Sequence, residues 1–337
     1  MSETVKIIQF HQIGGPDVLQ AASLPLPEPG PGEARLRVKA IGLNRAEIMF
    51  RTGGYYIDPE FPSHNGYEAA GLVEAVGPGV DPGLVGQTRS TVPNFPLNRY
   101  GVYGEVAIVP VTSLAAYPAH LSFEQGTSIW MQYITAYGAL IHNGRLTRGN
   151  HVVITAASSS VGLAAIQITK AEGGIAIATT RTRAKKPELL AAGADHVIVT
   201  DEENLRERIL QITGGAGANI IFDAVAGATL SDLALATAKN GLILIYGLLS
   251  PDPTPFPIFE TWTQAVALRP FKLMGYALHE ITGDPDALRE AIGYVYGKVD
   301  SGELKPRIDR TFTLDEIAEA HRYLEKNQHI GKVVVTV

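Results

Sequence analysis

The second half of the chain alternates short apolar runs with stretches long enough for a helix. From His151 onward the apolar runs read HVVITA, IAIATT, HVIVT, NIIFDAV and GLILIYG. Parallel strands are buried on both faces and need long crossover connections, so this alternation predicts a doubly wound α/β domain around a parallel sheet. Pro187 fits the first turn of one helix that Gly193 would close, and Asp201 could cap a second helix that ends near Ile212.

The first part of the chain, up to about residue 125, predicts a different architecture. Runs such as ARLRVKAIGL and EAAGLVEAV are bounded by the turn-rich stretches LPLPEPGPGE and GPGVDPGLVG. Short strands so closely bounded by Pro and Gly predict a small, partly open β-barrel.

After about residue 270 the pattern becomes mixed, with a helix near 286–298, a strand near 307–313, a helix near 314–326 and a last strand KVVVTV. A mixed tail of this kind indicates a return to the first domain. We therefore expect three segments, a barrel domain over 1–126, a parallel-sheet domain over 127–268 and a return to the barrel domain over 269–337.

Composition excludes several classes of partner. The 337 residues carry a formal net charge of -6, which gives no long-range attraction for nucleic acid or an anionic membrane. No apolar run reaches the roughly 18 to 20 residues of a membrane span, and the start MSETVKIIQF has neither a basic leader nor a long apolar core. The absence of cysteine excludes disulfides and fits a reducing compartment, so we expect a cytoplasmic protein with no nucleic-acid and no membrane partner.

The first apolar run of the second half leads into a turn of small residues. A helix beginning near Val161 would aim its free N–H groups and positive dipole end at this turn, which is the geometry that binds a pyrophosphate. Of the G-x-G-x-x-G fingerprint only Gly162 is kept, because Ala157 and Ser159 stand at the other two glycine positions. The alternative is a strand, turn and helix that only pack together. The candidate cofactor loop comprises Ala157, Ser158, Ser159, Ser160, Val161 and Gly162.

A cationic run follows the second strand of this domain. The fold places an acidic residue at this point when the cofactor is NAD, and a basic residue when it is NADP. Here Thr180 ends the strand, and the positions that follow include Arg181, Arg183, Lys185 and Lys186. A guanidinium can clamp a 2'-phosphate through charge-assisted hydrogen bonds. The run therefore predicts NADPH as the cofactor, with Thr180, Arg181 and Lys185 as binding residues, and solvated loop charges are the alternative.

Five motifs give the chain a family resemblance. They lie at 42–47 (GLNRAE), 66–80 (GYEAAGLVEAVGPGV), 133–140 (YITAYGAL), 157–168 and 189–198 (LLAAGADHVI). In this order and spacing they resemble the medium-chain dehydrogenase/reductase superfamily over essentially the whole chain, and most of all its zinc-independent, zeta-crystallin-like quinone oxidoreductase branch. The resemblance implies a GroES-like, partly open β-barrel catalytic domain joined to a Rossmann domain.

The resemblance also implies that a metal site is missing. Zinc-dependent members of the superfamily carry a Cys and a His where this chain has Asn44 and Tyr67, and only the acidic position, Glu68, is kept. Thiolate and imidazole are usual zinc ligands. We therefore expect no functional metal.

Further residues take their roles from the resemblance. Lys185 matches a lysine that often meets the adenosine phosphate, whereas Thr200 departs from a tyrosine that many relatives carry near the adenosine. Thr135 and Asn44 match positions that approach the nicotinamide. The carboxyl end of the strand GLILIYG should also face the nicotinamide, and the residues there are Tyr246, Gly247 and Leu248.

Hydride addition to an activated acceptor suits a site without a Lewis acid. A quinone or an α,β-unsaturated carbonyl delocalises the arriving charge onto an oxygen, where hydrogen-bond donors can stabilise it in place of a metal. The candidate donors are Tyr55, which matches a substrate-side tyrosine of the family, and Asn44. The sequence thus predicts an NADPH-dependent reductase that acts on a small-molecule quinone or on the C=C bond of an enone or enal.

Two alternatives stay open. An enoyl thioester reductase or a ketone reductase on the same frame would bind the cofactor identically. A non-catalytic NADPH-binding protein of the crystallin kind would keep only the binding. Relatives usually pair through their Rossmann sheets, and GLILIYG is a plausible edge strand, so the resemblance implies a homodimer.

Overall fold

The computed structural model describes residues 3–337, which divide into two compact units. The barrel unit comprises the chain up to Met131, Ile292–Asp300 and Pro306–Val337. The parallel-sheet unit comprises Gln132–Ala291 and Ser301–Lys305. The sequence-based limits at 126 and 268 differ from this division. The second limit differs more, because the segment after 268 adds a further strand to the parallel sheet.

Six parallel strands form the sheet of the parallel-sheet unit. In chain order they are β8 (His151–Ile154), β9 (Ile175–Thr180), β10 (His196–Val199), β11 (Ala218–Asp223), β12 (Thr237–Ile245) and β13 (Lys272–Gly275). Their spatial order, β10-β9-β8-β11-β12-β13, reverses between β8 and β11, which is the doubly wound Rossmann arrangement. This confirms the predicted fold class.

The edge of this sheet differs from the prediction. β13 pairs with β12 in parallel, so the strand GLILIYG lies inside the sheet and β13 is the edge on that side. The sequence gives little sign of β13, because KLMG is only four residues long and mostly exposed.

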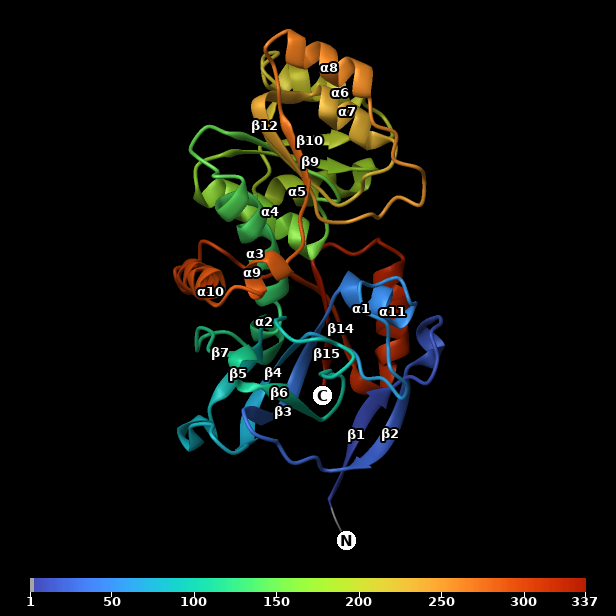
Figure 1. Cartoon of the computed structure of the whole chain (residues 1–337), viewed down its shortest axis with the longest axis vertical. Coiled ribbons are helices and arrows are strands. Elements are labelled where there is room, and N and C mark those ends of the chain that lie inside the picture. Colours follow the sequence, from blue (N-terminus) through green and yellow to red (C-terminus); the bar gives the residue numbers. More distant parts are fainter. Residues whose placement is uncertain (1–2) are drawn as a thin grey trace. The chain divides into compact units, whose positions relative to one another are not determined.

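Helices cover both faces of the parallel sheet. Those between strands are α4 (Ser160–Ala171), α5 (Lys186–Ala191) after a 3-10 turn (Arg183–Lys185), α6 (Leu205–Ile212), α7 (Thr229–Leu235) and α8 (Ile258–Val266). α4 and α5 lie on one side of β9 and β10, with α6 and α7 on the other (Figure 1). The side chains in the middle of the sheet have no exposed surface, and they are Val153, Ile177, Ile198, Ile221 and Ile243.

Two predicted helix ends can be compared with the structure. Pro187 lies in the first turn of α5, and Gly193 follows that helix with a φ of +105, as expected. Asp201 does not cap α6, so that prediction was wrong. The cap is Asn204, whose side-chain oxygen accepts from the N–H of Glu207 over 2.9 Å, because it directly precedes the first buried residue of the helix.

The barrel unit is built around the 11-residue strand β3 (Glu33–Leu43). β3 pairs antiparallel with β4 (Glu68–Val76), β6 (Val106–Pro110) and β15 (Lys332–Thr336). The other strands of this unit are β1 (Thr4–Gln9), β2 (Gln20–Pro25), β5 (Thr88–Thr91), β7 (Leu114–Ala115) and β14 (Ile308–Thr313). β14 and β15 bring the end of the chain back into this sheet, as the mixed pattern of the tail predicts.

The remaining helices are short except for α10. They are α1 (Arg45–Arg51), α2 (Phe123–Gly126), α3 (Trp130–Tyr137), which continues as a π-helical turn (Gly138–Asn143), α9 (His279–Thr282), α10 (Pro285–Asp300) and α11 (Ile317–Glu325). Short 3-10 turns lie at Pro16–Val18, Pro82–Leu84, Val111–Ser113 and Leu314–Glu316. Over residues 3–337, no helix has the length and apolar character needed to cross a membrane.

Candidate functional site

One part of the candidate site lies at the start of α1. Asn44 precedes this helix and Glu47 follows three residues later, a spacing at which a side chain can reach back over the helix N-terminus. The N–H of Asn44 donates to Glu47 Oε2 over 2.5 Å, and the Asn44 amide donates to Glu47 Oε1 over 3.0 Å. Glu47 Oε1 also accepts from the N–H of Tyr67 over 3.2 Å. One buried carboxylate therefore fixes both the helix start and the segment before β4.

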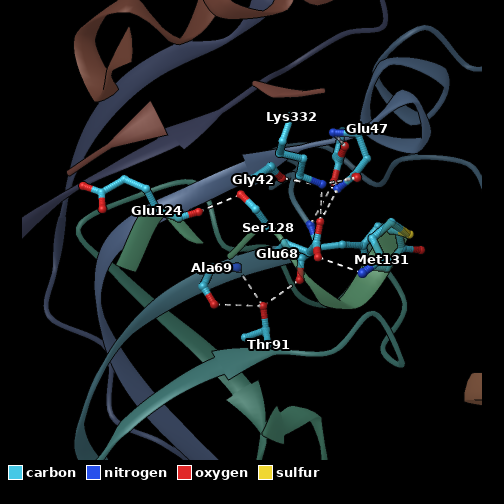
Figure 2. A network of polar contacts seen from close by, with 11 residues as sticks. Gly42, Glu47, Glu68, Ala69, Thr91, Glu124, Ser128, Met131 and Lys332 are labelled. Atoms are coloured by element: carbon cyan, nitrogen blue, oxygen red, sulfur yellow. Dashed lines mark hydrogen bonds and ion pairs between the residues drawn. The ribbon is translucent and has the colours of Figure 1, made fainter. Parts of the chain in front are cut away.

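Lys332 brings a positive charge to the same place from β15 (Figure 2). Its fully buried Nζ pairs with Glu68 and donates to Asn44 Oδ1 over 2.5 Å. The Asn44 amide donates to Glu68 Oε2 over 3.1 Å, and Glu68 Oε1 accepts from the N–H of Met131 over 2.8 Å. Asn44, Glu47, Glu68 and Lys332, which we call the buried cluster, thus satisfy one another.

Glu47 is the member of the buried cluster whose ionisation is most perturbed. The pKa of Glu47 is raised from 4.5 to about 7, mainly by burial and to a smaller extent by the charge of Glu68. The hydrogen bond from Asn44, the charge of Lys332 and the N–H of Tyr67 act in the opposite direction. Because desolvation outweighs these contacts, Glu47 changes its charge near neutral pH.

The buried cluster does not fit a zinc ion. Asn44 and Tyr67 offer an amide and a phenol where zinc prefers thiolate and imidazole. Glu68 is already neutralised by the ammonium of Lys332, which would repel a second cation at the same place. Within residues 3–337, no group of three or more His, Cys, Asp or Glu side chains could hold a metal ion.

The predicted donor Asn44 is committed to this cluster. Only 8% of its surface is exposed, and its amide already bonds to Glu47, Glu68 and the carbonyl oxygen of Gly42. Its amide oxygen accepts from Lys332. The structure therefore gives Asn44 a holding role in the barrel unit and favours the other candidate, Tyr55, as the donor.

Tyr55 lies beyond the end of α1 in a group of aromatic rings. Its hydroxyl lies 3.3 Å from that of Tyr67, and its ring packs edge-on against Phe50 and Tyr67. Burial raises the pKa of Tyr55 well above the usual range of a phenol. Tyr55 therefore stays protonated and is available as a hydrogen-bond donor.

The parallel-sheet unit holds a second candidate region, the loop between β8 and α4. Ser159 caps α4, and its Oγ accepts from the N–H of Gly162 over 3.0 Å. A Cβ at Gly162 would lie 2.6 Å from the Cα and carbonyl oxygen of Ala157, so only glycine lets the helix approach the loop this closely. Ser160 and Val161 form the first turn of α4. The one glycine kept from the fingerprint is thus required by packing.

The cationic run after β9 divides into two parts. Lys185 Nζ reaches the loop and donates to Ser158 Oγ over 2.9 Å. Arg183 pairs instead with Glu202 at 2.5 Å. Arg181 is exposed, and none of the described residues forms an ion pair with it. Lys185 therefore contacts the loop, Arg181 is available to a ligand, and Arg183 is already paired with Glu202.

Thr180 and Thr200 end neighbouring strands. Thr180 is 8% exposed, and its carbonyl oxygen accepts from the N–H of Thr200 over 2.8 Å. Thr135 lies on α3 and is 7% exposed. Thr180 and Thr135 therefore have little surface of their own, whereas Thr200 is partly exposed.

The residues after β12 line the end of the parallel sheet. Tyr246 stacks on Phe222 with ring centroids 3.9 Å apart, and its buried Oη makes no hydrogen bond of normal geometry within residues 3–337, although the Ser159 side chain lies near enough to affect its pKa. A Cβ at Gly247 would lie 3.0 Å from the carbonyl oxygen of Ala224, whereas Leu248 is 75% exposed. An unsatisfied buried hydroxyl is costly, so it marks a place where a ligand can supply the missing partner.

Sequence reasoning missed Thr155 and Asp223, which end the adjacent strands β8 and β11. Thr155 Oγ1 donates to Asp223 Oδ1 over 2.6 Å. The two Asp223 oxygens also accept from the N–H groups of Val225 (2.9 Å) and Ala226 (3.0 Å). This contact fixes the turn at the point where the strand order reverses. The available signal is a polar residue at the end of each of two apolar strands.

Comparison with known proteins agrees with this architecture. The family model described as Alcohol dehydrogenase GroES-like domain matches residues 30–119, and the model described as Zinc-binding dehydrogenase matches residues 192–335. With the mixed barrel sheet and the Rossmann sheet, these matches define the class as a medium-chain dehydrogenase/reductase.

Relatives within that class narrow the assignment. The chain is 31% identical over 328 residues to quinone oxidoreductase 1 of Escherichia coli (strain K12), with 96% of the chain and 97% of the relative covered. It is 30% identical over 335 residues to the synaptic vesicle membrane protein VAT-1 homolog of Rattus norvegicus, covering 96% of the chain and 81% of the relative. The crystal structure of Escherichia coli quinone oxidoreductase complexed with NADPH superposes with a TM-score of 0.89 at 29% identity, over 98% of this chain and 100% of that one. The chain belongs to the quinone oxidoreductase branch of the medium-chain dehydrogenase/reductase superfamily, and it is an oxidoreductase.

Proposed function

We propose that the protein transfers hydride from NADPH to a quinone or to the C=C bond of an α,β-unsaturated carbonyl. The observation that carries the proposal is the loop before α4, where a capped helix N-terminus, Ser158 and Lys185 come together. The relatives named quinone oxidoreductase, one of them solved with NADPH, support the same activity.

The parallel-sheet unit fits a bound dinucleotide on two observations. Gly162 lets the start of α4 pack directly against Ala157 of the loop, and the Oη of Tyr246 is buried without a hydrogen bond of normal geometry among residues 3–337. When bound, the reduced nicotinamide supplies the hydride. The N–H groups at the start of α4 would hold the pyrophosphate, and Arg181 and Lys185 would hold the 2'-phosphate through charge-assisted bonds.

The barrel unit would receive the charge that the hydride creates on the acceptor. Tyr55 is a protonated phenol that can donate to a developing enolate or quinol oxygen. The rings around it, including Phe50 and Tyr67, suit a flat conjugated acceptor. We propose that this reduction proceeds without zinc, because the charge of Lys332 already neutralises the one carboxylate kept from the metal site.

A substrate panel tests this proposal. Purified full-length protein is given NADPH with a quinone, an enone, an enoyl thioester and a ketone, and NADPH oxidation is followed. Turnover of the quinone or the enone is expected. Turnover of the ketone alone or of the enoyl thioester alone would favour those reductases. Tight NADPH binding without turnover of any acceptor would favour a non-catalytic binding protein.

We also propose that two copies pair through the parallel-sheet unit. α8 exposes 71% of Phe259, 61% of Trp262 and 62% of Val266, and no other strand of residues 3–337 covers the outer edge of β13. Exposed apolar surface and an open sheet edge both favour association. The cytoplasmic location expected from the sequence stays a prediction.

Sedimentation measures the proposed pairing. Wild-type protein should sediment as a dimer, and Trp262→Glu should sediment as a monomer because it places a charge in the paired surface. The matched control is Leu190→Glu, which changes an exposed leucine on α5 (44% exposed) and should leave the dimer intact. A monomeric wild type would contradict the proposal.

A further inference from the structure

Three tyrosines, Tyr55, Tyr56 and Tyr67, lie together in the barrel unit. The hydroxyls of Tyr55 and Tyr67 lie 3.3 Å apart, and the rings of Tyr55 and Tyr56 lie 4.6 Å apart at 60°. Burial, followed by the charge and hydrogen bonding of Tyr55 and Tyr56, raises the pKa of Tyr67 far above the usual range of a phenol. The hydroxyls of Tyr55 and Tyr67 therefore stay protonated, and each tyrosine hydroxyl of the group can donate one proton and accept another.

The three hydroxyls lie at different depths. Tyr56 is 60% exposed, Tyr55 is half-buried and Tyr67 is only 1% exposed. A hydroxyl as deeply buried as that of Tyr67 costs free energy unless it has partners. Tyr67 finds its partners in the other two tyrosines, so the group connects a half-buried phenol to one that water reaches.

Hydrogen bonds at both its N–H and its carbonyl oxygen hold the backbone of Tyr67 in place. Its N–H donates to Glu47 Oε1 over 3.2 Å, and its carbonyl oxygen accepts from Thr91 Oγ1 over 2.7 Å. Its ring also packs against Phe95, with centroids 5.5 Å apart. The buried cluster, through Glu47, thus fixes the position from which the Tyr67 hydroxyl meets Tyr55.

We infer that Tyr67, at the position of a zinc ligand in metal-dependent relatives, relays the proton that the reduced acceptor needs from Tyr56 to Tyr55. The inference rests on the proposed function. A bound NADPH would supply a hydride to the acceptor and be left as NADP+, and Tyr55 would give its proton to the acceptor oxygen that gains the charge. Tyr55 takes the proton of Tyr67, Tyr67 takes that of Tyr56, and Tyr56 is reprotonated by water. The acceptor gains one hydride and one proton, and no free phenolate accumulates.

Tyr67 acts through Tyr55 and is a positioning residue rather than a group on the acceptor. A purely structural tyrosine would be replaceable by phenylalanine, because the ring and its packing against Phe95 are kept. The relay needs the hydroxyl. The variant Tyr67→Phe therefore separates the two roles.

The test compares wild type with Tyr67→Phe, Tyr56→Phe and the matched control Tyr323→Phe. The hydroxyl of Tyr323 bonds to Asp309 over 2.7 Å, outside this tyrosine group. Single-turnover oxidation of NADPH by a quinone is followed in mixtures of light and heavy water, with NADPH affinity and melting temperature as independent readouts. Single turnover prevents slow product release from masking the step.

Tyr67→Phe should slow single turnover by about tenfold to a hundredfold, with unchanged NADPH affinity, since it removes a positioned proton donor. The rate of Tyr67→Phe should depend linearly on the fraction of deuterium in the solvent. The wild-type rate should instead curve with that fraction, because several protons move together. Tyr56→Phe, at an exposed position, should change the curvature in the same direction with a smaller loss, since water can replace it. Tyr323→Phe should match wild type.

Two failures are distinguishable. If wild type turns over and Tyr67→Phe keeps both its rate and its curvature, the relay is wrong and the proposed function stands. If wild type binds NADPH and reduces no acceptor, the proposed function falls and the relay falls with it. Should Tyr67→Phe prove unstable, the curvature of Tyr56→Phe decides, and a wild-type curve there would overturn the relay.

Discussion

In the barrel unit, Asn44, Glu47, Glu68 and Lys332 bond to one another and are all nearly or fully buried. In the parallel-sheet unit, the loop before α4 presents a capped helix N-terminus, and Arg181, which follows β9, is exposed. Both regions occupy positions where members of the superfamily bind a charged ligand. The first is closed by the protein's own side chains, whereas the second keeps groups that a ligand can satisfy.

If the proposed function is correct, the difference explains how one fold could lose one ligand and keep another. Closing a metal position requires an internal cation and polar partners for every group left behind, and Lys332 with Asn44 provides both. Keeping a dinucleotide position requires a helix that packs closely against its loop and a cation at that loop, which Gly162 and Lys185 provide. Variants in each of the two units test this difference.

Removing the internal cation has the largest expected effect. Lys332→Met leaves Glu68 charged and buried, which should lower the free energy of unfolding by about 3–5 kcal/mol in urea titrations. The double variant with Glu68→Gln should recover a large part of the loss, because no unpaired charge remains. Lys326→Met, at an exposed lysine after α11, is the control and should be near wild type. If Lys332→Met lowers the free energy of unfolding only slightly, Lys332 does not neutralise Glu68 as described.

The ionisation of Glu47 gives a second test of the buried cluster. Its pKa is about 7 when folded and 4.5 in the reference state, so the folded protein binds more protons between these values. The stabilisation is full below about pH 4.5 and is lost as pH rises through about 7, which lowers the free energy of unfolding by about 3 kcal/mol. Urea titrations across this range should show the fall in wild type and a flatter profile in Glu47→Gln. Parallel profiles for the two proteins would contradict the assigned pKa.

The affinities for NADPH and NADH test the parallel-sheet unit. Replacing both Arg181 and Lys185 with alanine should weaken NADPH binding by about tenfold to a hundredfold, since charge-assisted bonds to the 2'-phosphate are lost, and should leave NADH nearly unchanged. Arg183→Ala is the matched control, because Arg183 is occupied by Glu202. Equal losses for both cofactors in a fluorescence titration would refute the phosphate assignment.

The sequence predicts the parallel-sheet unit well because its signals are local. Five of its strands read as continuous apolar runs, and the small-residue loop directly follows the first of them. β13 escapes the same reasoning, because a four-residue, mostly exposed strand has no distinctive pattern. Asp201 and Asn204 are both plausible caps, and only the position of the first buried residue selects Asn204.

The buried cluster could not be predicted in the same way. Asn44, Glu68 and Lys332 lie far apart in the chain and meet only because β3 pairs with both β4 and β15. The sequence marks Asn44 and Glu68 as residues of a lost metal site, but nothing local shows that a lysine at the start of an apolar strand fills it. For the same reason Tyr67 reads as a missing ligand, and its contact with Tyr55 emerges only from the fold.

One rate separates a metal position filled by the Lys332 ammonium from one that still binds zinc. NADPH oxidation by a quinone is measured with protein dialysed against a strong chelator, before and after zinc is returned. The account predicts the same rate in both samples. A rate that is lost on dialysis and restored by one equivalent of zinc would contradict it.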